Sequence, residues 1–331
     1  LAVTMLEQVR SQQVSHALPV KAFTAVPASF WDGAVRPRHA GDERAPVEAL
    51  AHRYPGLEVE YVPSEHAPFD HGLDLLQSYA DVPLRGVGNM PWGTEIALRC
   101  RQAGKRVMLT GASGNGTLSM AAEGVIFGTW LRQGRWAHLA REHHAAMRLN
   151  PVGNYVKILA GRMFLTALPD WLYDRVRHRR HGQGGGGFRS FSAIHPDYAR
   201  DLGMKERLAE LDWDDRYRTP KTRRQLMEIM VRRGARDESG ALSEAMKAMV
   251  GVQGRDPLGD RRLLEFCYAI PDEQFFQGGQ DRSLIKRVMA GKLPHEVLQA
   301  PRGEQSADWH GRMTRDLPRI AEEIERLVTK P

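Results

Sequence analysis

The segment at residues 106–119, RVMLTGASGNGTLS, constrains the fold of this chain more than any other. Its apolar part, residues 107–109, has no polar interruption and has glycines on both sides, which predicts a short buried strand. Gly111, Gly114 and Gly116 then allow backbone conformations that other residues avoid, so main-chain N–H groups can converge on an anion. The pattern indicates either a phosphate-binding loop or an ordinary tight turn, and it matches neither the dinucleotide fingerprint nor the P-loop lysine motif.

The first third of the chain alternates between strand and helix patterns. We expect strands at residues 20–26 and 57–62, and helices at residues 42–51 and 94–103, the second leading into the strand at residue 107. This βαβ rhythm predicts a mostly parallel sheet with a ligand site at the carboxyl ends of its strands. The residues expected at this edge are Ala25, Val26, Gly111 and Ala112.

From residue 120 onward the pattern is helical almost throughout. Apolar residues recur at helical spacing and are expected in the core rather than around a cofactor. They are Trp130, Leu131, Trp136, Leu139 and Met147. The sequence therefore predicts an α/β part at residues 1–120, followed by a mainly helical part at residues 121–331.

The charge of the chain raises the question of a polyanionic partner. The net charge is +7 and the isoelectric point about 9.5, which is typical of some nucleic-acid-binding proteins. However, the arginines are scattered, and no aromatic ladder accompanies them. The densest cluster, at residues 175–181, precedes Gly184–Gly187 and indicates a mobile surface connector or a flap for RNA, an acidic peptide or a leader. We expect no nucleic-acid partner.

Cysteine use and hydropathy indicate a setting for the protein. Cys100 and Cys267 lie far apart in helical segments, which supports neither a disulfide framework nor a zinc cluster. No apolar run approaches the roughly 20 residues that span a bilayer, and no signal peptide is evident, so we expect a cytoplasmic protein without a membrane partner. The chain begins at Leu1 within an apparent amphipathic helix, so we expect upstream sequence to be missing.

Several polar residues invite a catalytic interpretation that their spacing does not support. His143 and His144 are adjacent and so lack the i, i+4 spacing of helical zinc ligands. Ser113 and Ser119 have no partner histidine and carboxylate that spacing would place beside them. The segment 89–92, which includes an asparagine, a proline and a tryptophan, is expected either to pack in the core or to shape an acceptor pocket.

Two later segments combine charge with turn signals. GRDPLGDRRLLEFC, residues 254–267, places charged residues around a proline before an amphipathic helix. LPHEVLQAPRG, residues 293–303, contains a proline suited to the first turn of a helix and then Arg302 in a polar turn. A guanidinium in that position could bind a phosphate with two hydrogen bonds, or it could be a solvated surface arginine.

Together these segments resemble the synthetase half of the asparagine synthetase family, which includes β-lactam synthetases and lasso-peptide cyclases. LTGASGNG, residues 109–116, is similar to the family motif SGEGGDE at the end of a strand. GRDPLGDRRLLEFC is similar to the family's arginine–proline–aspartate segment, and LPHEVLQAPRG to its later basic loop. The resemblance extends over essentially the whole chain.

The resemblance implies an α/β fold of the adenine nucleotide α-hydrolase (PP-loop ATPase) type, with a parallel sheet, flanking helices and a mostly helical C-terminal half. It also implies ATP and Mg²⁺ as cofactors, adenylation of a small-molecule or peptide carboxylate with release of pyrophosphate, and displacement of AMP by an amine. Ala25 matches a backbone contact to adenine, and Thr110, Gly111 and Gly114 match the nucleotide-binding loop. Arg302 stands where the family has a lysine that stabilises the transition state and pyrophosphate.

The chain also departs from the family pattern. The pyrophosphate loop SGGLDS and the glutaminase-like domain that would precede it are absent, so we expect these residues alone to be inactive. Ala112 replaces the motif's glutamate, and Asn115 replaces its metal-binding aspartate, which leaves a weaker magnesium ligand. Asparagine formation, a lasso-peptide-cyclase-like variant, a catalytically degenerate nucleotide- or peptide-binding relative and an unrelated basic polyanion-binding protein all remain open.

Overall fold

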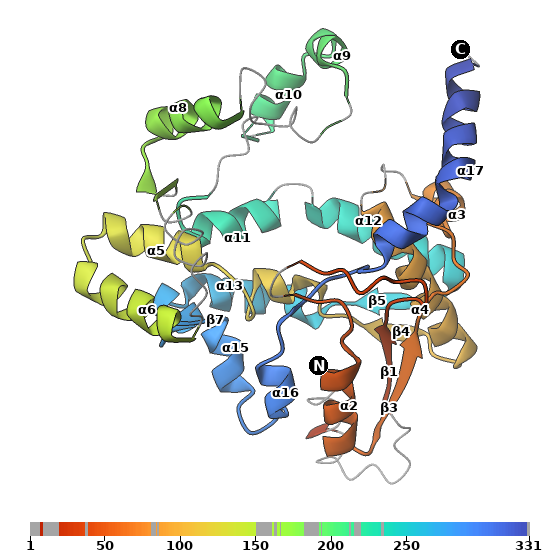
Figure 1. Ribbon diagram of the computed structural model, residues 1–331, viewed down its shortest axis with the longest axis horizontal. Helices are drawn as coiled ribbons and strands as arrows, with labels where there is room; N and C mark the ends of the chain where they lie inside the picture. The colour runs from red at the N-terminus through yellow and green to blue at the C-terminus, as the bar shows by residue number, and fades with distance from the viewer. Residues whose placement is uncertain are drawn as a thin grey trace. The chain divides into compact units, whose positions relative to one another are not determined.

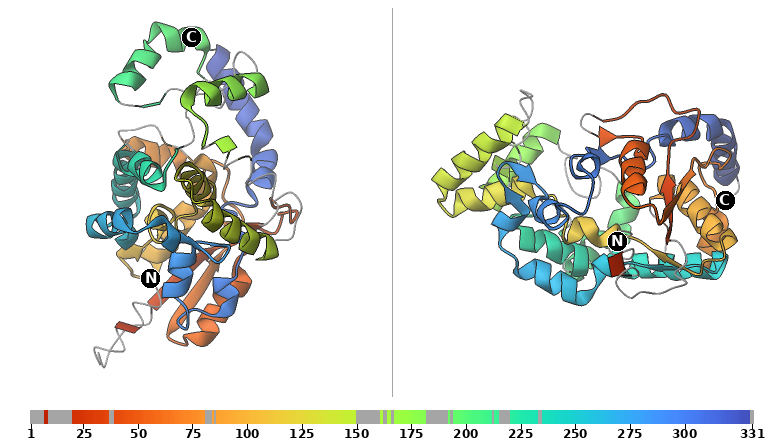
Figure 2. Two further views of the ribbon diagram at one scale, coloured as in Figure 1. Left: turned by 90° about the vertical axis from the view of Figure 1, so that its left-hand side faces the viewer. Right: turned by 90° about the horizontal axis from the view of Figure 1, so that it is seen from below.

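The computed structural model divides the chain into two compact units, each made of separate segments (Figures 1 and 2). Unit 1 comprises Leu1–Gly111, Asp237–Pro257 and Val288–Pro331, and unit 2 comprises Ala112–Arg236 and Leu258–Arg287. The structure describes residues 7–8, 20–36, 39–80, 84, 86–149, 161, 164–165, 167–181, 192, 194–211, 213–214, 220–232 and 235–329.

The first βα unit has the predicted form. Strand β1 (Val20–Ala25) pairs in parallel with β3 (Leu57–Val62), and α2 (Arg44–Arg53) lies in the connection between them (Figure 1). A short strand, β2 (His39–Ala40), precedes α2. The apolar residues of β1, α2 and β3 form one cluster around Tyr54 and Leu57, because parallel connections lay the helix against the sheet.

The second parallel pair in unit 1 joins distant parts of the chain. Strand β4 (Val107–Leu109) follows α4 (Met90–Gln102) and pairs with β5 (Gln253–Arg255), which the sequence analysis missed within a charged, glycine-containing segment. Met108 packs with Cys100 and Val252. The expectation of a fully buried strand is wrong, because Val107 and Leu109 are 56% and 37% exposed. Alternate side chains of a strand point to opposite faces, and only the Met108 face is covered in the described part of the chain.

Unit 1 contains further short and helical elements. They are η1 (Val87–Asn89), α3 (Leu73–Tyr79), α12 (Ala235–Val250), α16 (His295–Leu298), β8 (Arg302–Gly303) and α17 (Trp309–Thr329). The helix expected at the proline of residues 293–303 is confirmed as α16. Arg302 lies in β8 rather than in a turn, and β8 pairs in parallel with β2, with His39 opposite Arg302.

Unit 2 is predominantly helical. Its elements are η2 (Ala112–Gly116), α5 (Glu123–Arg132), α6 (Trp136–Leu149), α8 (Asp170–His181), α9 (Pro196–Asp201), α10 (Met204–Glu210), α11 (Arg223–Arg232), α13 (Arg261–Ala269), α14 (Asp272–Phe275), α15 (Ser283–Val288) and the antiparallel hairpin β6 (Phe276–Gln277) with β7 (Gln280–Asp281). A short turn, η4 (Pro257–Gly259), precedes α13. Helices α5 and α6 lie side by side in both figures.

Most of the apolar residues that were predicted to be buried lie in or against the core of unit 2. Trp130 and Leu139 are buried in one cluster, with Leu131 and Met147 packed against it. Trp136, in contrast, is 63% exposed, so its predicted burial is wrong. It is the first residue of α6, where a helical side chain leans toward the N-terminus and finds no preceding turn to cover.

Other sequence expectations have mixed outcomes. Cys100 and Cys267 lie in helices, as expected, and the structure shows both to be buried and free. The basic cluster at residues 175–181 forms the second half of α8 rather than a connector. Gly184–Gly187 and most of the expected N-terminal helix lie outside the described residues.

Candidate functional site

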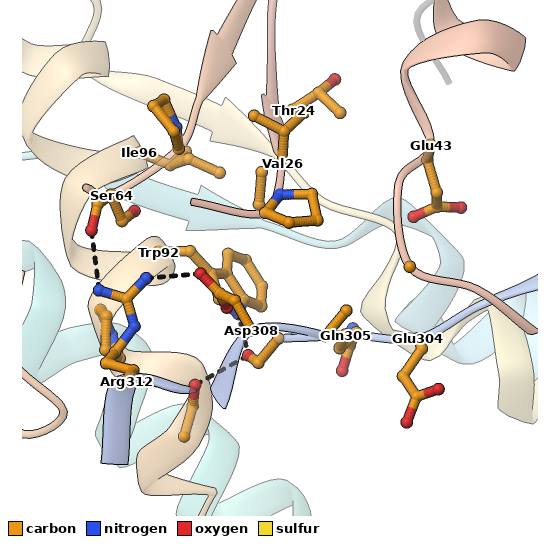
Figure 3. Close-up of a pocket in the computed structure, with 18 of the residues that line it drawn as sticks. Thr24, Val26, Glu43, Ser64, Trp92, Ile96, Glu304, Gln305, Asp308 and Arg312 are labelled. Atoms are coloured by element: carbon orange, nitrogen blue, oxygen red, sulfur yellow. Dashed lines mark hydrogen bonds and ion pairs between the residues drawn. The ribbon is translucent and has the colours of Figure 1, made fainter. Parts of the chain in front are cut away.

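Unit 1 contains a cavity of about 500 Å³ at the carboxyl ends of β1 and β3 (Figure 3). Its walls come from the ends of these strands, the loop before α2, the start of α4, the end of the β4 segment and the approach to α17. Ala25, Val26 and Gly111, which the sequence analysis placed at one edge, all line it. The βαβ pattern therefore predicted the position of the cavity correctly.

A buried ion pair fixes one wall of the cavity. Arg312 Nη2 donates to Asp308 Oδ2 at 2.7 Å, and the same carboxylate oxygen accepts the backbone N–H of Ala28 at 3.1 Å. Arg312 also donates from Nη1 to the carbonyl oxygen of Ser64 (Figure 3) and to that of Ala67. Both members of the pair are almost fully buried, so these hydrogen bonds compensate for the loss of water.

A second network holds Trp92 at the start of α4. Its indole Nε1 donates to Ser306 Oγ at 2.9 Å, and that hydroxyl lies 2.8 Å from the carbonyl oxygen of Gly88. Ser306 has a φ of +52°, which places its side chain against the start of α4. Pro91 and Trp92 therefore form part of the cavity wall, and Met90 and Pro91 are also buried.

Ser64 contributes a polar atom to the cavity without an internal partner. Its side chain is 6% exposed, and its Oγ has no hydrogen-bond partner among the described residues. The residue follows Pro63 at a φ of +48°, a conformation that is costly for a residue with a Cβ. A buried hydroxyl in a cavity wall is available to hydrogen-bond a ligand.

The remaining charged groups give the cavity an acidic character. Burial, reinforced by the neighbouring Asp42, raises the pKa of Glu43. The backbone N–H and guanidinium of Arg36 lower the pKa of Glu304. Gly303 allows the backbone to approach Glu43, since a Cβ at this position would lie 2.6 Å from its carboxylate. With Asp308, three carboxylates line the cavity.

The other predicted site residues do not line the cavity. The backbone N–H of Thr110 donates to the carbonyl oxygen of Arg255 at 2.8 Å and so extends the β4–β5 pairing. Arg302 is exposed on β8 and precedes the lining residues Glu304 and Gln305. Neither Thr110, Arg302 nor Ala112 is among the described residues that line the cavity.

The glycine-rich loop itself forms the 3₁₀ turn η2 in unit 2. Gly111, Gly114 and Gly116 all lack a positive φ, so the conformational reason expected for them is wrong. At two of these positions, close packing against other side chains requires glycine instead. A Cβ on Gly114 would lie 3.0 Å from Leu258, and one on Gly116 would lie 2.8 Å from Met230.

Asn115, the predicted metal ligand, is exposed on η2, and its Oδ1 accepts a hydrogen bond from Arg282 Nη2 at 3.3 Å. The residues that the structure describes contain no group of three or more His, Cys, Asp or Glu side chains arranged to hold a metal ion. The donor set around Asn115 therefore does not form a magnesium site by itself. Within the same residues, no helix combines the length and apolarity needed to cross a membrane.

Comparison with protein families agrees with this architecture. A sequence model described as asparagine synthase matches residues 2–326. The chain belongs to the asparagine synthase family. This membership supports a carbon–nitrogen ligase, and it agrees with the mixed α/β architecture and the parallel strand pairs. Comparison with curated proteins gives no match.

The sequence analysis missed three important site residues. Ser64 follows a proline at a strand end and carries no motif. Asp308 and Arg312 have the i, i+4 spacing of a helical ion pair, which was visible in the sequence. That spacing is common on helix surfaces, however, and only the structure shows this pair to be buried.

Proposed function

We propose that this asparagine synthase family chain forms an amide bond by adenylating a carboxylate with ATP. A carboxylate oxygen attacks the α-phosphorus, and the bond to pyrophosphate breaks. An amine nitrogen then attacks the acyl carbon, loses a proton, and AMP leaves with the bonding electrons. The observation that carries the proposal is the cavity at the carboxyl ends of β1 and β3, in a chain that matches the family over residues 2–326.

The cavity suits the nucleoside end of ATP better than its phosphates. Its three carboxylates can accept hydrogen bonds from ribose hydroxyls and an exocyclic amine, whereas they would repel phosphate. Its cation, Arg312, is already committed to Asp308 and two carbonyl oxygens. We assign the backbone at Ala25 to adenine and the unpartnered Ser64 hydroxyl to a further polar contact with the nucleoside.

The phosphates need groups beyond this cavity. We propose that the main chain at Thr110, Gly111 and Gly114 approaches them and that Arg302 neutralises developing charge on pyrophosphate. The described residues do not complete a magnesium site, so the metal would enter with ATP and rely on further ligands. A loop of the SGGLDS type is absent from the 331 residues, and we expect activity to require it.

The substrate carboxylate is a small molecule or a peptide. A lasso-peptide-cyclase-like variant would use a peptide, and the basic second half of α8 would suit an acidic segment of it. The amine would come directly from such a substrate, or as ammonia from a glutaminase-like partner domain. We place the reaction in the cytoplasm, where ATP is available.

The test measures pyrophosphate release and AMP formation by the complete natural protein with ATP, Mg²⁺ and a series of carboxylates and amines. We expect release that depends on both substrates, and we expect Arg302→Ala to reduce kcat at least 100-fold, within the range for a lost transition-state contact. Arg302→Lys should retain much of the rate. Arg148→Ala changes another exposed arginine and serves as the control.

A second function is favoured by Ala112 and Asn115. Loss of a carboxylate at both positions would suit a relative that binds nucleotide without catalysis. Saturable ATP binding by the folded, complete protein, with no pyrophosphate release for any substrate, would establish this alternative and overturn the synthetase proposal.

A further inference from the structure

A second cavity of about 440 Å³ adjoins the first within unit 1. It lies between the loop that follows β1 and the start of α17. Glu304 and Ala307 line both cavities, so the two share a wall. Molecules bound in the two cavities would therefore be close neighbours.

Three aromatic side chains line the second cavity, and two are held rigidly. The ring of Phe30 lies against Arg312 and Arg315, with guanidinium carbons 5.3 and 4.9 Å from its centre. Trp31 donates its Nε1 to the carbonyl oxygen of Ala34 at 3.3 Å. Gly41 packs against the Trp31 indole so closely that a Cβ would lie 2.4 Å from it. Rings fixed in this way lose little entropy when a ligand binds.

The third ring, Trp309, supplies the accessible surface. It is the first residue of α17, its ring lies perpendicular to that of His310 with centres 5.9 Å apart, and 45% of its surface is exposed. Exposed indole faces on a rigid framework are typical binding surfaces for other rings.

The charged groups of this cavity are largely satisfied internally. Arg36 donates from Nε to Glu304 Oε1 at 2.8 Å and from its backbone N to Oε2 at 2.9 Å. Asp32 Oδ1 accepts the backbone N–H of Ala34 at 2.9 Å. Paired charges and aromatic walls favour a neutral ring over a compact substrate such as aspartate, which carries three charged groups at neutral pH.

We propose that this cavity, which we call the ring pocket, binds an aromatic ring carried by the carboxylate substrate. The inference rests on the proposed adenylation, because the shared wall would place the substrate beside the nucleotide. The substrate class is thus an arylalkyl carboxylic acid or a peptide segment with an aromatic side chain. The side chain of Ala307, small and common to both cavities, leaves room for the link between ring and carboxylate.

Binding is tested first without catalysis, on the complete protein. Indole-3-propionate is compared with propionate and aspartate by saturation-transfer NMR and calorimetry. We expect the indole acid to bind at least tenfold more tightly than either, and Trp309→Ala to weaken it about tenfold. Trp136→Ala removes another exposed tryptophan, outside the ring pocket, and should leave binding unchanged. Equal binding of the three acids, or equal effects of the two variants, would overturn the inference.

Two further measurements separate this inference from the adenylation proposal. ATP with Mg²⁺ should not displace the indole acid, and competitive displacement would show that the ring pocket holds the nucleotide base instead. In pyrophosphate exchange, Trp309→Ala should raise KM for the aryl acid about tenfold and leave KM for ATP unchanged. If the indole acid binds but no acid supports pyrophosphate exchange, the adenylation proposal is overturned and the ring pocket is not. If aspartate supports pyrophosphate exchange but the indole acid does not bind, the ring pocket is overturned and the adenylation proposal is not.

Discussion

Arg282 donates a hydrogen bond from its guanidinium to the side-chain oxygen of Asn115. Arg282 itself has a φ of +57°, a conformation that side chains rarely adopt outside functional or tightly constrained segments. A cationic group therefore already contacts the side-chain oxygen of Asn115, which the sequence analysis predicted to be a magnesium ligand. This relationship makes the role of Asn115 directly testable.

Asn115→Asp should strengthen this contact, because it converts a hydrogen bond from a charged guanidinium to a neutral amide into one between opposite charges. If Asn115 is also near the metal, the added charge should lower the Mg²⁺ concentration for half-maximal pyrophosphate release. The matched control is Asn115→Ala, which should raise that concentration. If both variants have the same magnesium dependence as the natural protein, Asn115 is not a metal ligand.

Arg223→Met should strongly destabilise unit 2. This arginine is 1% exposed and donates to the Asp272 carboxylate at 2.8 Å and to the carbonyl oxygens of Cys267 and Ile270. Removing it leaves the buried acceptors unpaired, at an expected cost of about 3–5 kcal/mol in the free energy of unfolding. Urea denaturation measures the loss. The neighbouring, exposed Arg224→Met should cost less than about 1 kcal/mol.

Asp281 should make stability depend on pH. Burial, and then the nearby Glu123, raise the pKa of this carboxyl to about 6 in the folded protein, above its ordinary value of 3.8. The folded state therefore holds the proton more tightly, so stability falls as pH rises from about 4 to about 6 and then levels off. The difference corresponds to roughly 3 kcal/mol.

Asp281→Asn should remove most of that slope and raise stability at pH 7. Thermal unfolding of both proteins between pH 4 and pH 7.5 measures this difference. The prediction is contradicted if the natural protein becomes more stable relative to the Asp281→Asn variant as pH rises through this range.

Gly278 and Gly279 form a matched pair for testing close packing in the β6–β7 hairpin. Both have a positive φ, but a Cβ on Gly279 would lie 2.3 Å from the backbone N of Ala146, whereas one on Gly278 meets nothing within 4 Å. Gly278→Ala should cost about 1–2 kcal/mol through backbone strain alone. Gly279→Ala adds a backbone clash and should cost more than about 3 kcal/mol. Equal losses in denaturation would show that the hairpin moves aside freely.

Local patterns predicted much of unit 1. The strand at residues 57–62 has the predicted bounds, β1 ends one residue earlier than predicted, and α2 begins and ends two residues later. Parallel βα connections bring the carboxyl ends of strands to one edge of a sheet. The sequence therefore also predicted that Ala25, Val26 and Gly111 lie close together, and all three line the first cavity.

The rest depended on contacts between distant segments. Strand β5 has only three residues and exists because β4 offers it a partner, so its own sequence gives little strand signal. The glycines of η2 were predicted correctly as a turn but for the wrong reason, since Leu258 and Met230, far along the chain, explain why side chains are excluded. The burial of Arg312 likewise arises from partners near residue 65.

The division of each unit into separate segments has a consequence for biosynthesis. Strand β2 gains its partner only when Arg302 has been made, and the first cavity acquires Asp308 and Arg312 later still. A ribosome must therefore release the chain beyond residue 312 before both cavities are complete, and such long-range pairing is expected to be slow. A nascent chain that stops short of Gly311 would have no complete cavity for a ligand, so ligand binding would report that synthesis has passed this point.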